Sequence, residues 1–226
     1  MALLSDQDRQ TVRTHLAAIT APVTLLLFTQ TIGGPETALV ARQILDEIAD
    51  LNDQITVTEV NFVLEHDRAA EYGIDRIPAV VVLRDGEDTR IRFFGAPAGY
   101  EFMSLIEAVI AAGTGDSGLS PESRQLIAER ATAPIDIKVF VTPSCPHCPR
   151  VVTLAHRMAL ESPNIRAACV EATEFMDLSR QYRVTGVPKT VINDTIEILG
   201  AVPEAEFVET VLTPPEPTDT PATQVS

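Results

Sequence analysis

The chain contains an internal repeat, and this repeat is the feature that most limits the folds available to it. Tyr72–Pro78 (YGIDRIP) matches Tyr182–Pro188 (YRVTGVP), 110 residues further along the sequence. Phe94–Ala96 likewise matches Leu199–Ala201 at an offset of 105 residues. Self-similarity at a nearly constant offset indicates that one structural unit occurs twice. The 226 residues are therefore predicted to form two similar units in tandem.

The hydrophobic pattern of each unit predicts the order strand, helix, strand, helix, strand, strand, helix. This order is typical of an α/β fold in which helices flank a central mixed sheet of four strands. The elements predicted for the first unit are Val23–Thr29, Glu36–Leu51, Thr56–Phe62, Asp67–Tyr72, Ala79–Arg84, Ile91–Phe94 and Tyr100–Ala112. Those predicted for the second unit are Ile135–Thr142, Cys148–Glu161, Ile165–Glu171, Phe175–Tyr182, Lys189–Asn193, Ile196–Leu199 and Glu204–Leu212.

An additional helix is predicted at the start of each unit, at Ser5–Ile19 and at Ser120–Ala131, because a serine suited to an N-cap opens each segment. The glycine-rich segment Gly113–Gly118 is the predicted linker. The first unit is thus expected at residues 1–115, which contain no cysteine, and the second at residues 116–212, which contain all three.

Cys145-Pro146-His147-Cys148 places two thiols between the predicted strand Ile135–Thr142 and the helix that follows it. Unpaired N–H groups and the dipole at a helix N-terminus favour a thiolate and lower a cysteine pKa from about 8.5 to roughly 3.5–7.5. We therefore expect Cys145, at or next to the N-cap, to be nucleophilic, and Cys148 to close a disulfide with it. Pro146 suits the first helical position. A protonated His147 would stabilise the thiolate and make the disulfide more oxidising.

Metal binding and chance could also account for the C-x-x-C spacing. A zinc site needs about four ligands. Besides Cys145, Cys148 and His147 the chain offers only Cys169 and three scattered histidines, without a second C-x-x-C. Redox chemistry is therefore the favoured interpretation. Cys169 lies in the apolar strand Ile165–Glu171, where a buried, inert thiol is expected.

The formal net charge of −15 argues against binding to nucleic acids and to anionic membrane surfaces. Met1–Gln10 lacks the basic and apolar segments of a secretory signal, and no apolar run approaches the about 18 residues of a membrane span. We therefore expect a cytoplasmic protein, and in that reducing compartment a C-x-x-C is more often catalytic than structural. Residues 213–226 contain four prolines and are expected to form a disordered tail.

These features together resemble the protein disulfide oxidoreductases, which are glutaredoxin-like proteins made of two fused thioredoxin folds. The resemblance extends from the first helix to Leu212. It includes Phe140–Pro149 around the two thiols, Asp75–Ala79, and Phe94–Phe102. These segments together are specific to the family, whereas the C-x-x-C alone is not.

The resemblance implies roles for four residues of the second unit. Cys145 would be the attacking thiol and Cys148 the resolving thiol, with Pro188 as a cis-proline that faces them. Val187 would expose its backbone for strand-like pairing with a substrate. Pro78 would be the cis-proline of the first unit. The implied partners are disulfide-containing proteins, and no cofactor is implied.

The chain departs from this family in its first unit. Archetypal members carry a C-x-x-C in both units, whereas Gly33 and Glu36 occupy the corresponding positions here. A thiol-free first unit followed by an active second unit is similar to the N-terminal domain of the flavoprotein reductases of bacterial alkyl hydroperoxide reductase systems. This second resemblance implies an electron relay between a separate thioredoxin-reductase-like flavoprotein and a peroxiredoxin.

The proton-handling residues typical of thioredoxins are also missing. Cys169 stands at the position of their lysine and Val139 at that of their buried aspartate. Glu171 or Lys189 could substitute, although each is expected to be an ordinary solvated charge.

The predicted function is that of an enzyme, a thiol–disulfide oxidoreductase that uses the Cys145/Cys148 couple. The alternative is a relay or docking protein in which the thiol-free unit binds the partner.

Overall fold

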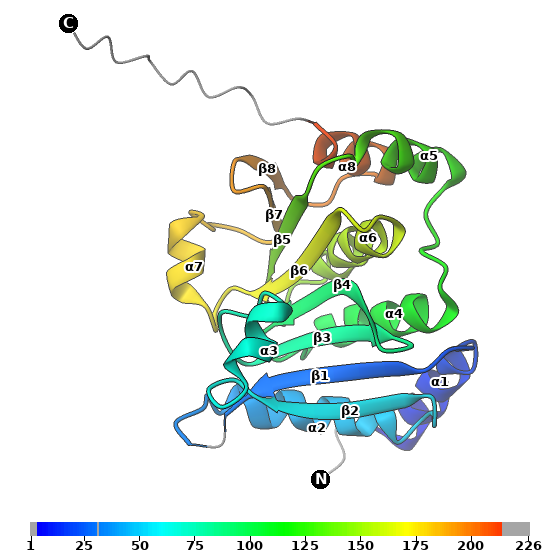
Figure 1. Cartoon of the computed structure of the whole chain (residues 1–226), viewed down its shortest axis with the longest axis vertical. Helices are drawn as coiled ribbons and strands as arrows, with labels where there is room; N and C mark the ends of the chain where they lie inside the picture. Colours follow the sequence, from blue (N-terminus) through cyan, green and yellow to red (C-terminus); the bar gives the residue numbers. More distant parts are fainter. Residues whose placement is uncertain (1–3, 31, 214–226) are drawn as a thin grey trace, which may run out of the picture.

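The eight strands of the protein form one mixed sheet. The structure, a computed structural model, describes residues 4–30 and 32–213, and the strand order is β2-β1-β3-β4-β6-β5-β7-β8 (Figure 1). The first unit supplies α1 (Asp6–Leu16), β1 (Val23–Thr29), α2 (Thr37–Ala49), β2 (Ile55–Asn61), α3 (His66–Glu71), β3 (Ala79–Arg84), β4 (Glu87–Phe94) and α4 (Glu101–Thr114). The second supplies α5 (Pro121–Arg130), β5 (Ile135–Val141), α6 (Cys148–Glu161), β6 (Ile165–Glu171), α7 (Met176–Gln181), β7 (Lys189–Ile192), β8 (Ile196–Leu199) and α8 (Glu204–Val211).

Local sequence signals account for these elements. β1, β3, α6, β6 and β8 begin and end at the predicted residues. The hydroxyl oxygen of Ser5 accepts the backbone N–H of Asp8 at 3.2 Å, and that of Ser120 accepts the N–H of Ser123 at 3.2 Å. Both predicted serine N-caps are therefore confirmed. Within the described residues, no helix has the length and apolar composition needed to cross a lipid bilayer.

The predicted linker at 113–118 is wrong at its first residues, because α4 continues to Thr114 and Gly115 ends the helix with a φ of 73°. Gly113 is buried inside α4. A Cβ atom at Gly113 would lie 2.6 Å from a methyl carbon of Ile19, so glycine lets the end of α4 pass close to the segment after α1. The glycine therefore serves helix packing rather than a flexible connection. Residues 214–226, in the predicted tail, lie outside the described residues.

The two units share one sheet because β4 pairs in parallel with β6, from Ile91 opposite Ala167 to Phe94 opposite Val170. Without this pairing both strands would be sheet edges with unpaired backbone N–H and C=O groups. The sequence predicts a four-stranded sheet in each unit, and the structure joins these two sheets edge to edge.

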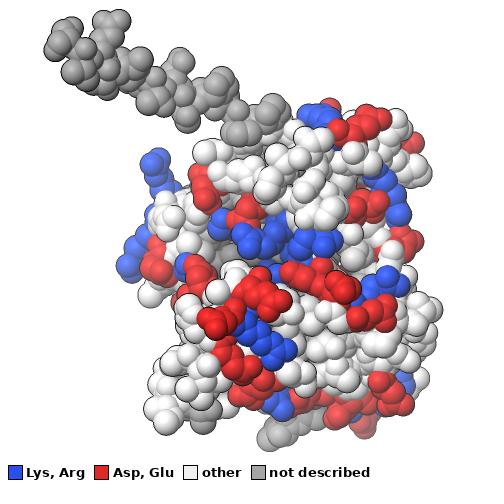
Figure 2. Space-filling view, viewed as in Figure 1, with Lys and Arg blue, Asp and Glu red and all other residues white. Residues whose placement is uncertain are grey.

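The joined sheet has a continuous core on one face and a divided one on the other. α4 of the first unit packs against α6 of the second, and Leu105 and Val152 of these helices are fully buried in a shared core (Figure 1). On the opposite face, two smaller cores lie separately in the two units. Between them Lys and Arg side chains form a band flanked by Asp and Glu (Figure 2), and a cavity of about 370 Å³ there is lined by Arg92 and Lys138 among others.

His156 of α6 lies in the shared core, where its side chain is only 3% exposed. Its ring packs edge-on against Phe93 of β4, with ring centroids 4.8 Å apart. Burial disfavours the charged imidazolium and lowers the pKa of His156 to about 3. The contact between the two units therefore requires a neutral histidine.

This burial predicts an acid-sensitive fold. The folded pKa of His156 is depressed, so its contribution to stability is present above the unfolded pKa of about 6.5 and is lost as the pH falls toward 3. Chemical denaturation should show a loss of about 2 kcal/mol from this group between pH 7.5 and pH 5. A His156→Leu variant should lack that loss, whereas His66→Leu, at an exposed position, should keep it. Identical pH dependence in His156→Leu and the parent protein would contradict the assignment.

Candidate active site

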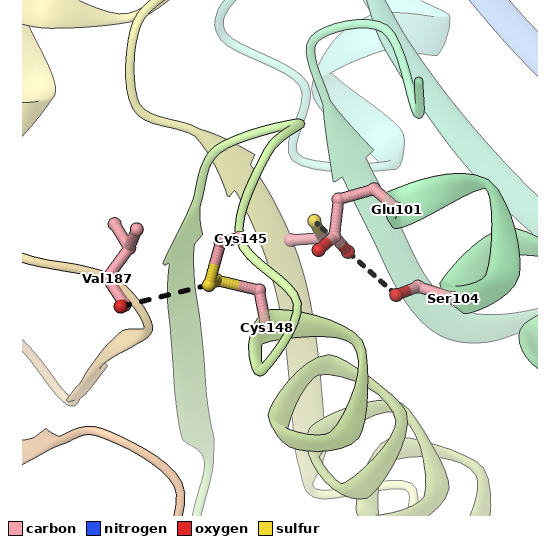
Figure 3. The surroundings of a disulfide bond; sticks show 6 residues. Glu101, Ser104, Cys145, Cys148 and Val187 are labelled. Carbon is pink, nitrogen blue, oxygen red and sulfur yellow. Dashed lines mark hydrogen bonds between the residues drawn. A yellow bond between two sulfur atoms is a disulfide. The ribbon is translucent and has the colours of Figure 1, made fainter. Parts of the chain in front are cut away.

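The two cysteines of the C-x-x-C form a disulfide in the connection between β5 and α6 (Figure 3). Their Cα atoms are 5.6 Å apart. Cys148 is the first residue of α6 and is fully buried, whereas Cys145 is 8% exposed. The N–H of Cys145 donates to the carbonyl oxygen of Thr142 at 3.1 Å, which turns the chain back toward the sheet before the helix begins.

α6 begins at Cys148 as its hydrophobic pattern predicts, but this start does not agree with the helix positions predicted for Cys145 and Pro146. The N-cap of α6 is His147, so Cys145 lies two residues before it and Pro146 does not occupy the first helical position. Pro149 instead lies in the first turn, where the missing N–H has no intrahelical partner to lose. The disulfide nevertheless holds the sulfur of Cys145 against that of Cys148, the first residue of the helix. The sulfur pair is therefore at the positive end of the helix dipole.

A cis-proline loop faces the disulfide. The Val187–Pro188 peptide bond is cis, as is Ile77–Pro78 in the first unit, so both predicted cis-prolines are confirmed. The sulfur of Cys145 lies 3.8 Å from the carbonyl oxygen of Val187 (Figure 3). In the disulfide this sulfur carries no proton, so the hydrogen bond would form only after reduction, when the thiol can donate.

Glu101 is a buried carboxylate beside the active-site loop, and it comes from the first unit. It is the first residue of α4 and is 2% exposed. Its Oε2 accepts the hydroxyl of Ser104 at 2.7 Å and the thiol of Cys169 at 3.6 Å. Its Oε1 has no hydrogen-bond partner among the described residues. Burial raises the pKa of Glu101 to about 6, against the weaker opposing effect of these two donors.

A direct backbone contact holds the start of α4 against the active-site loop. The N–H of Tyr100 donates to the carbonyl oxygen of Pro143 at 3.0 Å. Gly99 has a φ of 62°, and a Cβ atom there would lie 2.2 Å from the same oxygen, so no other residue fits without displacing the loop. Figure 3 shows the side chain of Glu101 extending from α4 toward the segment that carries the two cysteines.

Sequence reasoning did not identify Glu101, since an acidic residue in the first turn of a helix is an ordinary N-terminal signal. The feature that distinguishes it is burial, which depends on packing of the second unit over the first. The expected burial of the Cys169 thiol is confirmed. Its pKa is raised well above the usual value, chiefly by burial and further by the charge of Glu101.

Glu171 and Lys189 are not solvated charges, and that expectation is wrong. Both side chains are buried. The carboxylate of Glu171 accepts the backbone N–H groups of Thr173 and Glu174 at 3.1 and 2.6 Å. The ammonium of Lys189 donates to the carbonyl oxygen of Tyr182 at 2.6 Å and forms a 2.9 Å ion pair with a glutamate of β8. The charged groups of Glu171 and Lys189 therefore stabilise the loops that follow β6 and precede β7.

The corresponding loop of the first unit, between β1 and α2, carries no thiol. Gly33 and Glu36 lie in this loop, and α2 begins at Thr37. Across residues 4–30 and 32–213, no three or more His, Cys, Asp or Glu side chains are grouped so as to hold a metal ion.

Known proteins share this sequence pattern. Residues 135–213 match the family model described as a thioredoxin domain. The F subunit of alkyl hydroperoxide reductase of Staphylococcus epidermidis is 28% identical over 191 residues, which cover 79% of this chain and 34% of that protein. The chain therefore spans about a third of the length of this curated relative.

Two solved structures share the complete fold. The NTD_N/C domain of alkyl hydroperoxide reductase AhpF from Enterococcus faecalis has a TM-score of 0.86 and 30% identity, and the match covers 92% of this chain and 99% of that one. A protein disulfide oxidoreductase from Aeropyrum pernix has a TM-score of 0.84 and 27% identity, with 92% of each chain covered. With its two thioredoxin-fold units and one C-x-x-C disulfide, the chain belongs to the protein disulfide oxidoreductase family and is similar to the N-terminal domain of AhpF.

Proposed function

We propose that this protein is a thiol–disulfide oxidoreductase that exchanges electrons with partner proteins through the Cys145/Cys148 couple. The observation that carries the proposal is the disulfide at the start of α6, next to the carbonyl oxygen of Val187. A structural disulfide between residues three apart would close a very short loop and so would contribute little to stability. A reversible role in electron exchange accounts better for its presence.

The reaction takes two steps in which atoms and electrons balance. The thiolate of Cys145 attacks one sulfur of the partner disulfide, whose S–S bond breaks and releases the other sulfur as a thiolate. The thiol of Cys148 then loses its proton and attacks Cys145, which releases the second partner sulfur and closes the disulfide seen here. Two electrons pass to the partner, and the same steps run in reverse when the partner is a reductant.

Exposure supports these separate roles for the two cysteines. Cys145 reaches the surface, whereas Cys148 is fully buried behind it. A partner sulfur can therefore approach Cys145 alone. The sulfur of Cys145 is held at the first residue of α6, where helix N–H groups stabilise an anion. His147 is exposed in the same loop and would add to this stabilisation when protonated.

The loop before β7 is the proposed binding site for the substrate backbone. Val187 is partly exposed and Pro188 is buried behind it, so the backbone of Val187 is available on the side that faces Cys145. An extended substrate segment would pair with this backbone as an added strand and present its disulfide to Cys145.

Substitution of the resolving cysteine tests the proposed order of events. Cys148→Ser should stop turnover of insulin disulfides with dithiothreitol and should accumulate a mixed disulfide on Cys145, visible on non-reducing gels. Cys145→Ser should form no mixed disulfide. Gln54→Ser is the control, because this exposed residue precedes β2 at the edge of the sheet opposite to the disulfide, and it should leave insulin reduction within about threefold of the parent protein. Normal turnover by Cys148→Ser would rule out the mechanism.

Glu101 is the proposed acceptor of the proton that Cys148 must lose. Its carboxylate is buried, has one oxygen without a partner among the described residues, and has a pKa raised to about 6 by burial. It is therefore ionised at neutral pH yet basic enough to take a proton in the resolving step. The proton would pass through a bridging water or after a small movement, and it would return when the disulfide is reduced.

A pH profile tests this role. The rate at which Cys148 resolves a mixed disulfide should fall below pH 6 as Glu101 becomes protonated. Glu101→Gln should lower this rate by about 100-fold at pH 7.5 and abolish the pH dependence. Glu107→Gln, on the exposed side of the same helix, is the matched control and should change neither. A Glu101→Gln enzyme with the parent rate and profile would exclude the carboxylate from proton transfer.

The free energy of unfolding distinguishes a role of Glu101 in proton transfer from a purely structural role. The pKa of Glu101 is raised on folding, so its favourable contribution is complete below about pH 4.5 and is lost as the pH rises through about 6. Ionisation in the folded state therefore costs about 2 kcal/mol at pH 7.5. Glu101→Gln should be at least as stable as the parent protein at that pH, although it is slower.

Electron relay between a flavoprotein reductase and a peroxiredoxin is the second candidate, favoured by the similarity to the F subunit of alkyl hydroperoxide reductases. In this role the disulfide accepts electrons from a separate thioredoxin-reductase-like protein. A coupled assay with NADPH, a thioredoxin reductase, an oxidised peroxiredoxin and hydrogen peroxide should show peroxide consumption that requires Cys145. Insulin reduction without activity in this assay would leave the general oxidoreductase as the function.

A further inference from the structure

Six of the eight strands run in the same direction and end at the same edge of the sheet. β1 and β2 are parallel, β4 is parallel to β1 because both are antiparallel to β3, and β4, β6 and β5 are parallel to one another. β8 is also parallel to β5, since both are antiparallel to β7. We define the C-terminal edge as the ends of these six strands together with the loops and first helical turns that follow them (Figure 1). The Cys145/Cys148 disulfide lies on this edge, directly after β5.

The large hydrophobic side chains that are exposed in the described residues all lie on the C-terminal edge. They occur after β1, β2, β4 and β6, in the first turns of α2, α4 and α7, and at the last residue of β8. The most exposed are Ile32 at 90%, Leu64 at 82% and Leu39 at 75%. The full set is Ile32, Leu39, Val40, Val63, Leu64, Tyr100, Met103, Met176 and Leu199.

Their distribution is not that of an ordinary surface. Single exposed hydrophobic residues are common and are scattered over both ends of a sheet. Here all nine lie at one edge, and the opposite edge has none among the described residues. Figure 2 shows largely uncharged surface over the loops after β1 and β2 at lower left, on a molecule with a net charge of −15. Exposed hydrophobic surface concentrated in this way marks an interaction site.

The dimensions of the edge match those of a protein interface. Neighbouring strands are about 4.8 Å apart, so the edge from β2 to β8 is about 34 Å long. A standard interface buries about 800 Å² on each partner, which corresponds to a patch about 30 Å across. The loop after β1 lies four strand spacings, about 19 Å, from β5, so this loop and Cys145 fit within one such patch when Cys145 lies away from its centre.

We propose that the C-terminal edge is the docking surface for the folded protein whose disulfide exchanges with Cys145. The inference rests on the proposed function and extends it from the thiols to the whole edge. Cys145 is only 8% exposed and lies on this edge, so a folded partner whose disulfide reaches it must approach over the edge that also carries the exposed hydrophobic residues. Seven of the nine lie in the first unit, which has no thiol. That unit therefore supplies most of the docking surface.

Because one dithiol lies on one docking surface, the protein binds its electron donor and its electron acceptor one after the other. The chain has a single dithiol, so an electron donor and an electron acceptor must both approach Cys145 over the C-terminal edge. Two proteins cannot occupy a patch of this size together. Exchange therefore alternates between a reducing partner and an oxidised one on a shared hydrophobic surface.

The test compares a small disulfide with a protein disulfide. The double variant Leu39→Ser/Leu64→Ser alters two exposed residues of the first unit, four and five strand spacings from β5. Gln54→Ser is the control, since it precedes β2 at the opposite edge, whereas Leu64 follows β2. Each protein is reduced, freed of reductant, and mixed in a stopped-flow instrument with either 5,5′-dithiobis(2-nitrobenzoic acid) or an oxidised two-cysteine peroxiredoxin.

The double variant should react with the peroxiredoxin at least about tenfold more slowly, because loss of a buried hydrophobic contact at an interface can cost about that much affinity, and should react with the small disulfide at the parent rate. Gln54→Ser should match the parent protein with both. Equal rates for the double variant and the parent, or an equal loss with both substrates, would overturn the docking surface. So would a parent protein that reduces the small disulfide but not the peroxiredoxin, and in that case the oxidoreductase function would stand.

Failure of the parent protein with both substrates would instead contradict the proposed function itself. Sedimentation of the parent protein and of the double variant distinguishes docking of a partner from association between copies of this chain. A parent protein that is a dimer, with a double variant that is a monomer, would assign the edge to contacts between copies of this chain and would overturn the proposal.

Discussion

The parallel pairing of β4 with β6 sets the positions of the other parts of the molecule. It removes an edge from each four-stranded sheet and fixes the second unit relative to the first. Because of it, α4 and α6 pack on the same face and share a core that crosses the boundary between the units. Because of it also, the start of α4 reaches the loop that carries Cys145. A shift of this pairing by one residue would reverse the face of every side chain in one unit and would separate these groups.

The two units divide the proposed work between them. The second holds both thiols and the cis-proline loop, whereas the first contributes Glu101 and most of the exposed hydrophobic surface at the C-terminal edge. A unit that lacks thiols can therefore still serve the reaction. Its lack of a C-x-x-C leaves one site for exchange, and in the proposed mechanism Glu101 of the same unit takes the place of the aspartate that Val139 does not provide.

Much of the fold could be predicted from local patterns. Continuous apolar strands such as β1 and β3 and the serine N-caps are short-range signals, and the corresponding elements appear where expected. The errors have a common cause. Glu171 and Lys189 are charged residues at positions where exposure is the usual expectation, and only the folded conformation of the neighbouring loops brings hydrogen-bond partners to them in a buried environment. Pro146 is compatible with a helix start, but Pro149, three residues later, is too, and only the folded loop decides between them.

The sequence was enough to predict the repeat, the order of the elements, the Cys145/Cys148 pair and the two cis-prolines, because each is recognised from short segments of residues close together along the chain. Three features became visible only in the folded molecule: the two sheets fuse, Glu101 is buried beside the loop that carries the Cys145/Cys148 disulfide, and the exposed hydrophobic residues gather at one edge. These features arise from strand pairing and burial between segments far apart in sequence. Local conformational preference carries no information about which distant surfaces will exclude water from one another.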